Sequence, residues 1–131
     1  MAIAQTPPTR EQLDRWLSPT ATTSERVQGL LAIGLSPADL SRAFGLTVSA
    51  LRNWGTGQAE PRPDAAITLD DLRAVAKILL DGDLEPQRVA HWMRGWNPRI
   101  ESRPLDSVAT KPMEVRAAAH GEVLGRAMVA A

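Results

Sequence analysis

The chain has 131 residues, which is enough for one compact domain. It contains no cysteine, and this excludes a disulfide framework, a thiolate nucleophile and any cysteine-based metal site. Fifteen Lys and Arg balance fifteen Asp and Glu, so nucleic acid could not be held by bulk positive charge, and a few well-placed cations would have to suffice. We find neither a secretion signal nor an apolar run of about 18 residues, and therefore expect a cytoplasmic protein without a membrane segment.

The spacing of apolar residues predicts helices throughout, and no alternating pattern typical of a strand occurs. Residues 1–8 carry two prolines and no periodicity, and are expected to form a flexible leader. Thr9 and Gln12 have the spacing of a capping box and predict a short helix. A second helix is expected to begin near Ser24 and to end at Gly34. We therefore predict an all-α fold.

Residues 35–57 contain two helix signatures separated by a glycine. The sequence SPAD, which begins at Ser36, supplies a cap, a proline at the first helical position and an acidic residue in the first turn. Gly45 permits the positive φ that a tight turn needs, and Thr47 can cap the next helix. Leu46 is expected to fill the space between the two helices. This arrangement predicts a helix-turn-helix.

The second of these helices would present a polar face. Leu51 and Trp54 lie three residues apart and are expected to point inward. The residues left outside are Val48, Ser49, Arg52 and Asn53. Arginine can pair with guanine, asparagine can pair with adenine, and valine can pack on a thymine methyl group. Thr47, at the amino terminus of this helix, and Arg42 suit phosphate groups. The alternative is an ordinary helical hairpin with a solvated face.

Two prolines in residues 58–67 predict a linker. We place a helix-turn-helix DNA-binding region at 9–63 and a second helical domain at 64–131. Thr68 is expected to cap a long helix that ends at Gly82.

Three further helical segments follow, beginning near Pro86, at Pro104 and at Pro112. The last is long, and its apolar residues on one side are Met113, Ala117, Leu124 and Met128. Small residues recur there every four positions and would let another helix approach closely: Ala117, Gly121 and Gly125. The first three tryptophans occupy apolar helical stripes and are expected in the core, whereas Trp96 should be partly exposed.

Five residues of the 35–57 segment fall where the Xre (Cro/C1) helix-turn-helix family has its signature residues: Leu35, Leu40, Gly45, Trp54 and Gly57. The segment resembles that family without a gap. The second half is similar to the toxin-binding domain of the Xre/MbcA/ParS antitoxin group. The matching features are a Trp-bearing helix at Trp92, an Asn97-Pro98 turn, a short helix at Arg103–Asp106 and a terminal helix from Glu114.

This resemblance implies an antitoxin of a type II toxin–antitoxin system that binds double-stranded operator DNA and represses its own operon. It further implies a RES-domain toxin acting on NAD as partner, with the terminal segment of the antitoxin entering the toxin's cleft. Leu124 and Met128 would then be apolar anchors, and Arg116 and Arg126 would be the cations that face the toxin. The alternative is a stand-alone Xre-type repressor whose second half only dimerises.

A two-fold homodimer is expected in either case, because a neutral helix-turn-helix with few phosphate contacts needs two half-sites. His91 and His120 do not have the spacing of a metal site. The sequence also lacks the glycine-rich and nucleophile motifs of common enzymes. We therefore expect no metal, no cofactor and no catalytic residue.

Overall fold

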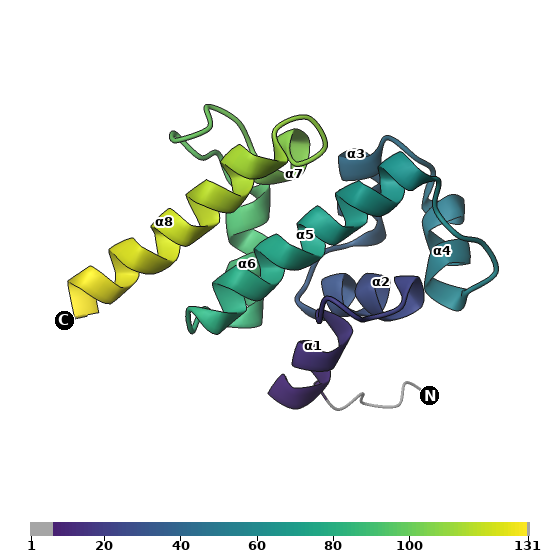
Figure 1. Ribbon diagram of the computed structural model, residues 1–131, viewed down its shortest axis with the longest axis horizontal. Coiled ribbons are helices and arrows are strands. Elements are labelled where there is room, and N and C mark those ends of the chain that lie inside the picture. The colour runs from purple at the N-terminus through teal and green to yellow at the C-terminus, as the bar shows by residue number, and fades with distance from the viewer. Residues whose placement is uncertain (1–6, 131) are drawn as a thin grey trace, which may run out of the picture.

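The computed structural model describes residues 7–130, and within them the secondary structure is helical apart from turns and one isolated β-bridge between Asn97 and Ser102 (Figure 1). This confirms the all-α prediction. The helices are α1 (Arg10–Trp16), α2 (Thr23–Ala32), α3 (Pro37–Phe44), α4 (Val48–Thr56), α5 (Pro63–Asp81), α6 (Pro86–Arg94), α7 (Pro104–Ser107) and α8 (Pro112–Ala130). Most of the expected leader at 1–8 lies outside the described residues.

Helix α5 is the centre of the molecule. It runs between α2 on one side and α8 on the other, as Figure 1 shows, and it also contacts α6. Its middle is buried on nearly all sides, from Thr68 to Ala76 with only Asp70 half-buried. A helix that is covered all round in this way belongs to a core rather than to a surface layer.

One hydrophobic core joins the two halves of the chain. It extends from Leu13 of α1, through Leu40 and Leu51, to Val115 and Ala119 of α8. Removal of this much apolar surface from water is the main stabilising contribution to the fold.

The tryptophans follow the prediction in outline. Trp54 is buried, Trp16 and Trp92 are partly buried and pack against the core, and Trp96 is 67% exposed. Each of the first three therefore contributes its ring to the core.

Three helices begin with a full capping box, in which a hydroxyl accepts from the third backbone amide of the helix and the third side chain accepts from the cap's amide. The boxes at Thr9 and Ser36 confirm the predicted starts. The cap of α2 is Thr22, slightly earlier than expected. The Ser24 hydroxyl instead donates to the carbonyl oxygen of Gly55 and ties α2 to α4.

The predicted start of the central helix is wrong. Helix α5 begins at Pro63, so residues 63–67 are helical and the connection is shorter than the expected linker. Thr68 is no cap, because its hydroxyl donates to the carbonyl oxygen of Asp64 at 3.3 Å from within the helix. The physical reason is that proline suits the first position of a helix. Its ring fixes φ at a helical value, and the backbone N–H that it lacks would have no partner within the helix there.

None of the helices within residues 7–130 is both long enough and apolar enough to cross a membrane.

Candidate nucleic-acid interface and carboxy-terminal surface

The turn between α3 and α4 has the predicted backbone. Gly45 ends α3 in the left-handed conformation, with φ 65° and ψ 32°, which glycine adopts at little cost. Thr47 caps α4 by accepting a hydrogen bond from the Ala50 amide at 3.2 Å. Two hydrogen bonds join Ser41 to Leu46 across the turn. The Ser41 carbonyl accepts from the Leu46 amide, and the Ser41 hydroxyl donates to the Leu46 carbonyl. The start of α4 is therefore fixed relative to α3.

The expected role of Leu46 is wrong. Its side chain is 37% exposed and lines a surface groove together with Trp54 and Pro61, instead of filling the space between the helices. That space is occupied by Phe44, whose ring meets Trp54 edge-on with centroids 5.1 Å apart. An aromatic pair of this geometry packs favourably without help from the turn residue.

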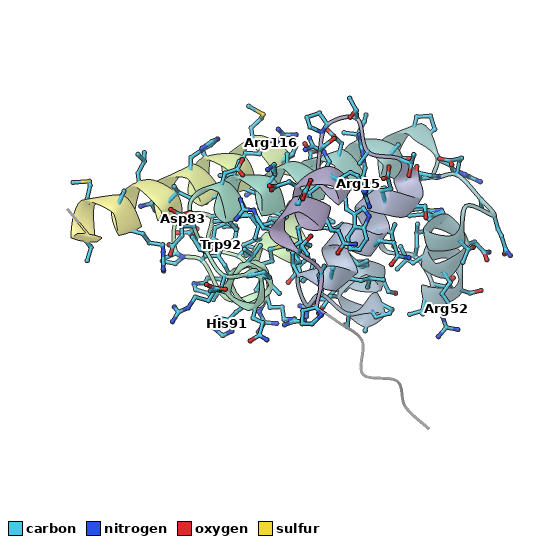
Figure 2. All side chains as sticks on the ribbon, turned by 90° about the horizontal axis from the view of Figure 1, so that it is seen from below. Arg15, Arg52, Asp83, His91, Trp92 and Arg116 are labelled. Atoms are coloured by element: carbon cyan, nitrogen blue, oxygen red, sulfur yellow. The ribbon has the colours of Figure 1, made fainter. Side chains whose placement is uncertain are left out.

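Helix α4 has one buried and one exposed face. Leu51 and Trp54 are 3% and 4% exposed, which confirms that they point inward. On the other side Ser49, Arg52 and Asn53 are exposed, while Val48 is half-buried. Figure 2 shows Arg52 directed outward from the edge of the molecule. Three of the four predicted base-contacting side chains thus share an accessible polar face.

The two cations near this face are in different environments. Arg52 has no carboxylate within ion-pair distance among residues 7–130. Arg42 of α3, in contrast, lies with its Nε 2.7 Å from a carboxylate oxygen of Asp106 in α7. A phosphate at Arg42 would have to compete with this ion pair, whereas one at Arg52 would not.

Arg116 lies within a network of ion pairs between α8 and α5. Its Nη2 is 2.6 Å from Oδ1 of Asp71, a carboxylate that is buried, and 3.7 Å from Asp70. The structure therefore places Arg116 apart from the other predicted toxin-contacting residues, which lie at the end of α8.

Asp70 is the shared carboxylate of this network, which also contains Arg26 and Arg73. Burial by itself would raise the pKa of Asp70. The hydrogen bond from Arg73 and the positive charges of Arg73, Arg26 and Arg116 outweigh burial, and the pKa lies below its usual value of 3.8. The carboxylate is thus held in its charged form.

The end of α8 projects from the body (Figure 1). Val123 is the last side chain that packs on the core, and it sits so closely on Gly82 that a side chain at Gly82 would displace it. From Leu124 to Val129 every residue is exposed. Leu124 and Met128 are 64% and 78% exposed, and Arg126 is exposed on the opposite side of the helix.

Arg99 is a residue beside this end that the sequence reasoning missed. Its guanidinium packs directly on Gly121, and it lines a shallow groove with Glu122 and Arg126. The signal was present in the Asn97-Pro98 turn, where the Asn97 side chain accepts from the Arg99 amide at 2.9 Å. That bond fixes where the following arginine leaves the turn.

The fold and these surfaces define a small all-α protein with an exposed polar helix face on one side and an exposed apolar helix end on the other. No family model matches the sequence, and no solved structure matches it. Among curated proteins it is 32% identical over 105 residues to the probable mycobacterial cidal antitoxin Rv3188 of Mycobacterium tuberculosis. The aligned region covers 78% of this chain and 88% of the relative. The chain therefore belongs to the family of this antitoxin.

Proposed function

We propose that this protein is a cytoplasmic, DNA-binding antitoxin of a type II toxin–antitoxin system, which neutralises a RES-domain toxin that degrades NAD and represses its own operon. The observation that carries the proposal is the antitoxin relative, whose similarity extends over most of both chains. The two exposed surfaces supply a separate place for each activity, and both activities are binding rather than catalysis.

Operator binding is assigned to α4. Arg52 and Asn53 would read guanine and adenine in the major groove, and the half-buried Val48 can reach a thymine methyl group only from its exposed side. Ser49 would share this base-contacting face, and the capped start of α4 at Thr47 would lie against the phosphate backbone. Because the chain has no net charge, two copies on two half-sites would be needed for useful affinity.

Toxin binding is assigned to the projecting end of α8. Leu124 and Met128 are large, exposed and one helical turn apart, and apolar side chains of this kind provide the buried anchors of an interface. Arg126 lies between them in sequence but on the opposite side of the helix, and would contact acidic or carbonyl groups on another wall of the toxin's cleft. Arg116 would contribute only by leaving its ion pair with Asp71. The RES class of the toxin rests on the resemblance of the Asn97-Pro98 and Arg103–Asp106 segments.

Co-expression with the adjacent toxin gene tests the proposal. The full chain should restore growth and cellular NAD, and a chain lacking 124–131 should not, while circular dichroism shows that both chains are equally helical. The truncation begins at Leu124 because Val123 packs on Gly82. Ile67→Asp is the control and should restore growth as the full chain does. Ile67 is as exposed as Leu124, but it lies on α5 rather than at the end of α8.

Two results would contradict this assignment. If the truncated chain still restores growth, the end of α8 does not bind toxin. If the full chain neutralises no neighbouring toxin yet still protects an operator, the protein is a stand-alone Xre-type repressor.

A further inference from the structure

Helix α8 carries an apolar face on each of two opposite sides. Val115, Ala118 and Ala119 are buried toward the core. On the far side lies what we call the outer stripe, which consists of Met113, Ala117, Leu124 and Met128. Met113, Leu124 and Met128 are 74%, 64% and 78% exposed, and Ala117 is also exposed. A helix that is apolar on both sides is expected to be covered on both.

The outer stripe is free of acidic and basic side chains. With about 100° of rotation per residue, Glu114, Arg116, Glu122 and Arg126 all lie roughly 70° or more from its centre. His120 is the only ionisable residue of α8 close to it. A partner therefore needs an apolar and uncharged surface of similar length, about 22 Å.

The outer stripe is complementary to itself when two copies run antiparallel. Positions 113 and 128, 117 and 124, and 120 and 121 are each equally distant from a point between His120 and Gly121. A two-fold axis through that point places Met113 against Met128 of the second copy and Ala117 against its Leu124. It also places His120 against its Gly121. A large side chain thus faces a small one at each of the two inner positions.

We propose that the outer stripe is the seam of a two-fold homodimer in which the α8 helices of two copies pack antiparallel. The projecting residues from Leu124 onward would then rest on the part of the second copy's α8 that α5 supports. No like charges of α8 meet in this register. Arg99, which lies on Gly121 at the flank of the stripe, is a flexible side chain that has to move aside. The seam is short, so we expect a reversible dimer rather than an obligate one.

One consequence rests on the proposed function. Leu124 and Met128 would be anchors for the toxin and part of the seam, so a toxin molecule and a second copy would compete for them. Toxin in excess would separate the dimer and weaken operator binding, because single copies hold only one half-site.

Charge substitutions of the full chain, without toxin or DNA, test the seam. Wild type should be a dimer by sedimentation at micromolar concentration. Ala117→Glu and Leu124→Lys should each weaken the dimer by about tenfold or more, because each places a charge against an apolar group. The double variant should recover most of the loss, because each new glutamate faces a new lysine across the two-fold axis. Circular dichroism of all variants checks that α8 stays helical.

Because the chain lacks cysteine, single introduced thiols report the register directly. The two thiols of His120→Cys lie next to the two-fold axis, and this variant should form a covalent dimer on mild oxidation. The thiols of Met113→Cys, on the same face, would be about 22 Å apart and should not react with each other.

A wild-type chain that stays monomeric at high micromolar concentration would overturn the seam. So would charge variants that dimerise as well as wild type, or cross-linking of Met113→Cys rather than His120→Cys. None of these measurements involves toxin or DNA. Failure of the seam is therefore distinguishable from failure of the antitoxin function.

Discussion

Helices α4 and α8 both expose one face to solvent, but they are held to the body in different ways. Helix α4 is short, begins and ends at the defined caps Thr47 and Gly57, and is anchored by the large side chains of Leu51 and Trp54. Helix α8 is anchored by small side chains and by the ion pair between Arg116 and Asp71, and its last turns have no support. The exposed face of α4 is polar and that of α8 is apolar. The first suits a solvated ligand such as DNA, and the second suits another protein.

The largest expected effect comes from removing the anchor of α4. Trp54→Ala should lower the free energy of unfolding by about 3–5 kcal/mol, because it leaves a cavity beside Phe44 in the core. Urea unfolding followed by circular dichroism measures this. Trp96→Ala is the matched control, since Trp96 is 67% exposed and its loss should cost about 0.5 kcal/mol or less. Similar losses for the two variants would show that α4 is not held by its tryptophan.

The exposed face of α4 should affect binding without affecting stability. Arg52→Ala and Asn53→Ala should each weaken binding to the operator by about 1–3 kcal/mol, because each removes a pair of hydrogen bonds to a base. Fluorescence anisotropy with a DNA fragment from upstream of the gene, at one fixed salt concentration, measures the change.

Arg88→Ala provides the control for this measurement. It removes the same charge from an exposed position on α6 and should leave operator affinity nearly unchanged. If all three variants bind alike, α4 does not read bases.

The smallest expected effect is the acid sensitivity of the ion-pair network that anchors α8. The pKa of Asp70 is lower in the folded chain than its usual value of 3.8, so this carboxylate stabilises the fold above that pH. The contribution is lost as the pH falls from 3.8 through the lowered pKa. Asp70 is 39% exposed, and solvent screening limits its contribution to about 0.5–1 kcal/mol.

Asp70→Asn should therefore be less stable than wild type at pH 6 and should approach it near pH 2.5, as urea unfolding at both pH values would show. A gap that widens on acidification would contradict the assignment.

The features that local sequence determines were predicted well. Ser36, Gly45 and Thr47 act on the backbone within three or four residues of themselves, so their roles can be read from spacing alone. The inward positions of Leu51 and Trp54 follow from helical periodicity in the same way. The start at Pro63 was missed because two nearby prolines were interpreted as a linker, although proline is favoured at the first position of a helix.

The features that depend on distant partners were not predicted. Arg42 meets Asp106 and Arg116 meets Asp71, pairs separated by 64 and 45 residues. Nothing in the local pattern of either arginine distinguishes an ion pair from a free cation. Periodicity also grouped Met113 with Leu124 on one side of α8, but it could not determine whether that side faces the core or the solvent, because the opposite side is apolar too.

The single core that joins α1–α4 to α5–α8 has a consequence for how long the protein persists in a cell. Because α5 packs on both α2 and α8, neither half can lose its packing without exposing the other, and the chain is expected to unfold in one cooperative step. A protease that acts on the unfolded chain would then remove the face of α4 and the packed part of α8 at the same rate. The unsupported end from Leu124 can fray without global unfolding, so free antitoxin would lose this end first and keep the face of α4 longer.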